Sequence, residues 1–193
     1  MIDVWVERAS DGPAPAHEWL RERVAPCLGV NPDDVPLHVD RDGGLSLLAT
    51  DFHVSLSHHR QWRSVALSGD GPVGIDVLAV PEDADFVDDT TLVLSSDEIA
   101  WVHSAPREQQ GAAFAECWVR KEAYAKLRRT GLTGELSQLT FSPKPISTPD
   151  VAFWMARVDD AMVAVATFGA RVPEVRLHTT EHPAERRSGI ATL

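Results

Sequence analysis

Residues 107–129 read REQQGAAFAECWVRKEAYAKLRR, and this stretch is the longest helix that the sequence predicts. It contains no proline and one glycine, and Gly131 and Gly134 follow it as stop signals. Side chains spaced by four residues form one slowly turning stripe along this helix: Phe114, Trp118, Glu122 and Lys126. The apolar half of the stripe must pack inward, and a carboxylate and an ammonium continue it.

The charged half of the stripe allows two interpretations. A Glu122–Lys126 pair at i,i+4 is common on exposed helix faces, where it contributes only tenths of a kcal/mol. On a core-facing side, the same charges cost free energy unless they are paired or bound to an ion. The second interpretation predicts a functional site at the end of the helix.

The basic residues are unevenly distributed. Of 18 lysines and arginines, only three are lysines, and two of these, Lys121 and Lys126, lie in the long helix. The third is Lys144, and arginines at 120, 128 and 129 flank the helical pair. This cluster is either an anion site or a solvated helix face.

Composition excludes several classes of protein. The chain has 193 residues, of which 44% are hydrophobic, which suffices for one compact unit. The net charge of −11 argues against nucleic acid and anionic membranes as partners. No apolar run is long enough to span a membrane, and Cys27 and Cys117 form no CxxC motif. We therefore expect a cytoplasmic protein.

Working outward from the long helix, short strands and helices alternate without a regular βαβ pattern. This order predicts an α+β fold with antiparallel sheets. A second helix is expected over 17–28, and a third begins at an N-cap near Ser95. Strands are expected at 2–6, 35–39, 54–57, 64–67, 73–78, 151–158, 162–168 and 175–178, and Asp42-Gly43-Gly44 predicts a turn.

Two further segments carry side chains with chemical potential. Asp76 stands inside an apolar strand, where an acid is disfavoured, so it is a solvent-facing residue, a metal ligand or a catalytic acid. Gly74 would let another chain or a ligand approach closely. Ser57 and His58 end an earlier strand and could hold a phosphate. Other histidines are interpreted as structural or surface residues: His38, His53, His103 and His182.

Taken together, these segments resemble 4′-phosphopantetheinyl transferases. Residues 114–126 resemble the FxxxWxxKEAxxK signature of that family, 72–77 resemble its GIDxE motif, and 54–58 resemble its FNxSHS motif. Residues 154–166 are similar to its closing strands. The motifs occur in the order of the family, and the resemblance covers roughly residues 36 to 178.

The resemblance implies a fold of two α/β halves related by a pseudo-two-fold axis, each with a small antiparallel sheet and a long helix. The active site would lie in the cleft between them. We expect an N-terminal half at 1–79, a C-terminal half at 80–180 and a flexible tail at 181–193. The length favours a monomer of the longer, pseudo-dimeric type.

The resemblance also implies a reaction. Mg²⁺ and coenzyme A would bind in the cleft, and a serine of an acyl or peptidyl carrier protein would attack the β-phosphate. Asp76 and Glu122 would hold the metal, and Lys126 would pair with the phosphates. Lys126 could help to take the serine proton, or a carboxylate or a metal-bound water could do so. Lys121, His58 and Ser57 would bind further phosphate oxygens. The arginine-rich composition suggests polyketide or peptide synthases as the source of the carrier.

Three positions depart from the family pattern. Leu78 stands where bacterial members often have a second glutamate, so one metal carboxylate is missing. Arg41 would replace a basic residue that often precedes the serine–histidine motif. The N-terminal basic stretch of longer members is also absent. Two alternatives therefore stand beside an active transferase: an impaired member that only binds carrier proteins, and another Mg²⁺-dependent enzyme acting on nucleotides.

Overall fold

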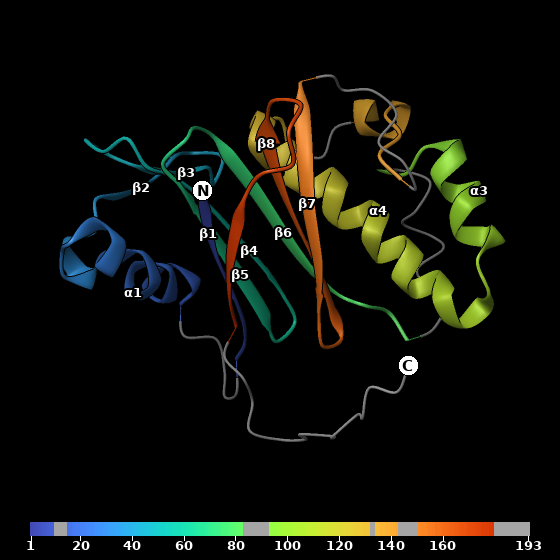
Figure 1. Cartoon of the computed structure of the whole chain (residues 1–193), viewed down its shortest axis with the longest axis horizontal. Coiled ribbons are helices and arrows are strands. Elements are labelled where there is room, and N and C mark those ends of the chain that lie inside the picture. The colour runs from blue at the N-terminus through green and yellow to red at the C-terminus, as the bar shows by residue number, and fades with distance from the viewer. Residues whose placement is uncertain (10–14, 83–92, 132–133, 143–149, 180–193) are drawn as a thin grey trace, which may run out of the picture.

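The structure, a computed structural model, describes residues 1–9, 15–82, 93–131, 134–142 and 150–179. Two sheets lie at its centre (Figure 1). The α1 helix (Ala16–Leu28) and the hairpin of β2 (Leu37–Val39) and β3 (Leu45–Leu47) lie at one end of the molecule (Figure 1). The α3 (Ser96–Ser104) and α4 (Arg107–Arg128) helices lie at the other end. The mixed α+β class expected from the sequence is confirmed.

The first sheet has the strand order β4-β5-β1-β9. The β1 strand (Ile2–Arg8) pairs antiparallel with β5 (Trp62–Ser68), which pairs antiparallel with β4 (His53–His59). On its other side, β1 pairs in parallel with β9 (Val175–Thr179). The N-terminal and C-terminal parts of the described chain therefore share one sheet.

The α1 helix (Ala16–Leu28) buries Trp19, Leu20 and Val24 in a cluster with side chains of β4 and β5. Gly29 ends this helix in the left-handed conformation. Its φ is 68°, a value that favours glycine because glycine has no Cβ. A short 3₁₀ turn (Pro32–Asp34) leads into a small hairpin of β2 (Leu37–Val39) and β3 (Leu45–Leu47). This hairpin was expected only as one strand and a turn.

The second sheet has the order β6-β8-β7, with all pairs antiparallel. Its strands are β6 (Val73–Ala79), β7 (Val151–Val158) and β8 (Ala161–Phe168). The predicted long helix is α4 (Arg107–Arg128), and it packs against β6 and β8. Helix α3 (Ser96–Ser104) begins at a capping box formed by Ser95 and Glu98, and the 3₁₀ segment η2 (Gly134–Gln138) follows α4.

The expected halves at 1–79 and 80–180 stay a prediction, and the strand pairing crosses between them. The β6 strand lies in the second sheet because it pairs with β8, while β9 returns to the first sheet. A division by sheets falls between β5 and β6. The expected tail at 181–193 and Lys144 lie outside the described residues. Among the described helices, none combines the length and apolar character needed to cross a membrane.

Candidate active site at the crossing of α4 and β6

Helix α4 crosses β6 in direct backbone contact at Gly74. A Cβ atom on Gly74 would lie 2.0 Å from the carbonyl oxygen of Ala123 and 2.6 Å from the amide nitrogen of Leu127. Gly74 is therefore needed for close approach, as the sequence indicated, and the chain that approaches is α4 itself. The contact brings the charged half of the helical stripe over the strand.

Asp76, two residues after Gly74 on β6, accepts hydrogen bonds from two side chains. Its side chain is buried, and its Oδ1 atom accepts from the Lys126 Nζ at 2.7 Å and from the Ser57 hydroxyl at 2.6 Å. The Lys126 ammonium is partly exposed, so the ion pair joins a buried acid to the surface. The interpretation of Asp76 as a solvent-facing acid is thereby excluded.

Glu122 lies close enough to Asp76 for the two carboxylates to repel each other. Burial raises the pKa of Glu122, and the charge of Asp76 raises it further, while Lys126 lowers it. Burial also raises the pKa of Asp76 against the opposing effect of Lys126 and Ser57. A second carboxylate next to a buried one is an arrangement that favours a bound cation.

These donors fit the Mg²⁺ that the resemblance implies. Within the described part of the chain, no three His, Cys, Asp or Glu side chains gather closely enough to hold a metal alone. Mg²⁺ does not need such a cage, because it usually takes one or two carboxylates and completes its shell with water and substrate phosphates. Asp76 and Glu122 supply that number of carboxylates.

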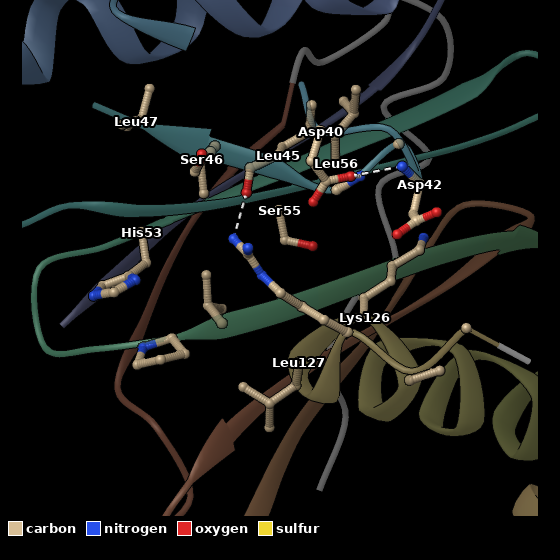
Figure 2. Close-up of a pocket in the computed structure, with 18 of the residues that line it drawn as sticks. Asp40, Asp42, Leu45, Ser46, Leu47, His53, Ser55, Leu56, Lys126 and Leu127 are labelled. Atoms are coloured by element: carbon tan, nitrogen blue, oxygen red, sulfur yellow. Dashed lines mark hydrogen bonds between the residues drawn. The ribbon is translucent and has the colours of Figure 1, made fainter. Parts of the chain in front are cut away.

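A pocket of about 940 Å³ opens above the crossing. Glu122, Lys126 and the C-terminal end of α4 form one wall, and His58 and other β4 residues line it as well. The opposite wall is the β2–β3 hairpin, so Lys126 and the turn with Asp40 and Asp42 belong to opposing walls (Figure 2). A cavity of this size accommodates a cofactor-sized ligand.

Comparison with known proteins identifies the family. A family model described as the 4′-phosphopantetheinyl transferase superfamily matches residues 72–183, more than half of the chain. The chain belongs to this superfamily. The matched range contains β6 with Asp76 and α4 with Glu122 and Lys126, and it excludes β4 with Ser57 and His58.

Two relatives of the superfamily are similar to parts of the chain. The 4′-phosphopantetheinyl transferase psf-1 of Bacillus pumilus is 38% identical over 90 residues, which cover 46% of this chain and 37% of the relative. The match thus spans little more than a third of that protein. A holo-(acyl-carrier-protein) synthase from Bacillus anthracis, solved in complex with CoA (3′,5′-ADP), has a TM-score of 0.41 and 22% identity over 52% of this chain and 96% of its own.

Of the superfamily motif residues, Lys121 lies elsewhere than expected. Its side chain is fully buried and pairs with Glu98 at 2.8 Å, and it is not among the described residues that line the pocket. In this structure the ammonium points into the protein on another side of α4, and the expected role in phosphate binding stays a prediction. Periodicity alone does not show the partners that a side chain finds in other segments.

The rest of the cation cluster also serves mainly structural contacts. Arg120 donates to the Phe141 carbonyl at 2.8 Å, and Arg128 stacks over the rings of Tyr124 and Phe168. Arg129 donates to the Leu45 carbonyl at 2.9 Å and so joins the end of α4 to the β3 strand across the pocket. The cluster is thus neither a single anion site nor a plain solvated face. Its contribution to the pocket is Lys126 and Arg129.

Three β4 residues, Ser55, Ser57 and His59, form hydrogen bonds with β6, and of these Ser55 also lines the pocket. The Ser55 hydroxyl accepts from the Ile75 amide at 3.1 Å, and the His59 Nδ1 accepts from the Ala79 amide at 3.1 Å. Ser57, between them, donates its one hydroxyl proton to Asp76. In this structure the Ser57 hydroxyl proton is therefore directed at Asp76, and the expected hydrogen bond to a phosphate stays a prediction.

Two other expected residues differ in their placement. His58 is exposed and lines the pocket, where the sequence placed it. Arg41 is exposed at the hairpin turn and is missing from the described lining residues, although Asp40 and Asp42 on either side are present. The expected basic role of Arg41 therefore has no counterpart in the pocket wall.

The hairpin wall of the pocket could not be recognised from the sequence. Asp40 Oδ1 accepts from the amides of Asp42 at 3.0 Å and Gly44 at 2.7 Å, which closes the turn. The Asp42-Gly43-Gly44 signal predicted a turn, but no local pattern places it opposite α4. His53, set aside as a surface residue, also lines this pocket.

Leu78 packs in the apolar core. It lies two residues after Asp76 on β6, it is 8% exposed, and it belongs to a cluster that includes Phe114 and Cys117 of α4. Strand alternation places it on the same face as Asp76, but further along α4, where the neighbours are apolar. The missing glutamate is thus replaced by core packing.

We expect Leu78→Glu to lower the free energy of unfolding by about 3 kcal/mol in metal-free buffer, because it buries a carboxylate among apolar groups. Urea denaturation measures this change. Leu78→Met is the control, since a volume-conserving exchange costs less than about 1.5 kcal/mol. A glutamate variant as stable as the control, with tighter Mg²⁺ binding, would show that this side chain reaches the ion.

The side-chain hydrogen bonds that join β4 to β6, here called the β4–β6 seam, include one made by His59. This bond makes the stability of the protein depend on pH. Burial lowers the pKa of His59 below its usual 6.5, with Arg60 as the next cause. The neutral ring accepts the Ala79 amide proton, so this contribution is fully present above pH 6.5 and is lost as pH falls through the lowered pKa. His59→Asn, with an amide oxygen as acceptor, should lose less stability between pH 7 and about pH 5.

Chemical denaturation at both pH values tests this expectation. His38→Asn on the exposed β2 strand is the matched control, and it should retain the full acid-side loss of the unaltered protein. An identical loss in the His59 and His38 variants would contradict the role given to the seam.

Proposed function

We propose that this protein is a 4′-phosphopantetheinyl transferase that moves the phosphopantetheine arm of coenzyme A to a serine of an acyl or peptidyl carrier protein. The observation that carries the proposal is that Glu122 and Lys126 line the pocket while Asp76, buried behind the wall, pairs with Lys126, in a chain of this superfamily. We further propose that the protein acts as a cytoplasmic monomer on carriers of polyketide or peptide synthases.

Each residue of the set has a role in this reaction. Asp76 and Glu122 would hold Mg²⁺, which neutralises charge on the pyrophosphate when it is bound. Lys126 and His58 face the same pocket and would bind phosphate oxygens. Ser57 holds the Asp76 carboxylate in place through its hydroxyl.

The proposed reaction needs only coenzyme A and the carrier serine as reactants. The carrier serine oxygen forms a bond to the β-phosphorus as the bond from that phosphorus to the bridging oxygen breaks, and 3′,5′-adenosine diphosphate leaves. Phosphoryl transfer mainly requires alignment and charge neutralisation. For the serine proton, Glu122 is the better acceptor, because its carboxylate lines the pocket and has oxygens that can take up a proton. The ammonium of Lys126 has no lone pair to accept a proton.

The main alternative is an impaired member that binds carrier proteins without modifying them. The burial of Leu78 favours it, because a second acidic side chain is lacking on the Asp76 face of β6. Measuring the 3′,5′-adenosine diphosphate that is released from coenzyme A, with and without an apo carrier, distinguishes a transferase from a binding module and from a nucleotide hydrolase. We expect release only when Mg²⁺ and carrier are both present. Release without carrier would indicate a nucleotide hydrolase, and no release would indicate the binding module.

A further inference from the structure

We infer that Lys121 is a positioning residue, which locks helix α3 and residues 134–142 onto α4 and thereby orients Glu122, and that it takes no part in phosphate binding. The inference rests on the proposed function for the role of Glu122. Its structural basis is a buried polar cluster outside the pocket, made of Lys121, Glu98 and the chain around Phe141.

The Lys121 ammonium has a complete set of partners. Its Nζ lies 2.8 Å from Glu98 Oε2 and 2.5 Å from the Leu136 carbonyl oxygen, and it also donates to the Leu139 carbonyl. An ammonium has three N–H donors, and these three oxygens use all of them. Moving Nζ to a phosphate would leave a fully buried carboxylate without its counter-ion, which is strongly unfavourable.

Glu98 connects the other two segments. Its Oε2 accepts from the Ser95 amide at 2.9 Å, which caps α3, and its Oε1 accepts from the Phe141 amide at 2.7 Å. The Ser95 and Thr140 hydroxyls are 2.9 Å apart. One carboxylate therefore holds the start of α3, the chain after η2 and the Lys121 side chain of α4.

Arg120 strengthens the same attachment. Its guanidinium donates to the Phe141 carbonyl at 2.8 Å and to the Ser142 hydroxyl at 2.5 Å. Two successive helix residues thus bind the segment that follows η2. This double attachment resists rotation of α4 about its own axis.

The orientation of Glu122 follows from helix geometry. Consecutive residues of an α-helix point about 100° apart, so burial of Lys121 on the side of α3 and 134–142 leaves Glu122 facing the pocket. Gly74 lies against one side of α4, and the contacts of Lys121 with Glu98 and residues 134–142, here called the lock, hold another side. Together these contacts leave α4 one rotational setting. That setting brings the charges of Glu122 and Asp76 together.

The test compares Lys121→Met, Glu98→Gln and the two substitutions together in one chain. Coenzyme A affinity is measured by calorimetry, kcat and KM with an apo carrier, and Tm by circular dichroism. Lys126→Met is the pocket control and should weaken coenzyme A binding at least about tenfold. For both single lock variants, we expect a lower Tm, a coenzyme A Kd within about threefold and a kcat reduced about tenfold at temperatures well below Tm.

The double variant should recover much of the lost Tm, because no unpaired charge remains in the core. A tenfold rise in Kd for Lys121→Met, with Glu98→Gln unaffected, would overturn the inference and make Lys121 a phosphate ligand. Unchanged kcat in folded variants would also overturn it. If Lys121→Met fails to fold, Glu98→Gln, which keeps the shape of the side chain, provides the same comparison.

Failure of the proposed function would look different. In that case the unaltered protein would bind no coenzyme A and modify no carrier. The lock itself would still be tested by Tm, since additive effects of the two single variants would contradict a direct coupling between Glu98 and Lys121.

Discussion

Replacing Glu122 by glutamine is expected to lower the rate of phosphopantetheine transfer at least about 100-fold, the usual loss when one electrostatic group of an active site is removed. The variant removes one of the two carboxylates proposed to hold Mg²⁺ and the proposed acceptor of the serine proton. We expect the same direction for Asp76→Asn. The measurement is kcat/KM with an apo carrier at saturating Mg²⁺.

The fold should survive this substitution. The pKa of Glu122 is raised in the folded protein, so its protonated form is favoured there, and the stabilisation is present below pH 4.5 and lost as pH rises through the raised pKa. At pH 7 the ionised side chain therefore opposes folding. We expect Glu122→Gln to melt at the same temperature as the unaltered protein or higher at pH 7, with the difference disappearing in acid.

Glu116→Gln is the matched control on the same helix. Glu116 pairs with Arg120 at 2.9 Å and is not among the described residues that line the pocket. Its variant should transfer phosphopantetheine at the normal rate. Near-normal kcat/KM in Glu122→Gln, or equal losses in both variants, would show that the assignment of Glu122 is wrong.

The second large effect is expected for Gly74→Ala. The new methyl group would meet backbone atoms of Ala123 and Leu127 at 2.0 and 2.6 Å, and backbone cannot turn aside as a flexible side chain can. Helix α4 must therefore shift away from β6. We expect a loss of at least about 2 kcal/mol of unfolding free energy from overpacking and about a 100-fold loss of transfer rate from displacement of Glu122 and Lys126.

Gly69→Ala is the matched control for this prediction. A Cβ there meets only the Phe52 ring, at 3.5 Å, which is an ordinary contact. Urea denaturation and the transfer assay should therefore show little change. If Gly74→Ala were as stable and active as Gly69→Ala, the helix would not depend on direct contact with the strand.

The features of the site that depend on neighbouring residues in the sequence could be predicted. The four-residue spacing of Phe114, Trp118, Glu122 and Lys126 follows from the period of a helix, and α4 carries them as expected. Asp76 was visible as an acid in an apolar strand, and the structure gives it Lys126 as a partner. Both inferences needed only sequence periodicity and the cost of burying charge.

The remaining features depend on contacts between distant segments. Lys121 and Glu98 are 23 positions apart, and no pattern around either residue indicates that they form a pair. The parallel pairing of β9 with β1 joins opposite ends of the described chain. The direction of the Ser57 hydroxyl depends on β4 lying beside β6. Such contacts are set by tertiary packing, which local propensity does not encode.

We propose that the protein transfers a phosphopantetheine group from coenzyme A to a carrier protein, and that Asp76, Glu122 and Lys126 are required for this transfer. Intact-mass spectrometry of an apo carrier after incubation with the protein, coenzyme A and Mg²⁺ tests it most directly. We predict a mass gain of one phosphopantetheine group on the carrier serine with the unaltered protein, and an unmodified carrier with Glu122→Gln. An unmodified carrier with folded, unaltered protein at high concentration, across acyl and peptidyl carriers, would contradict the claim.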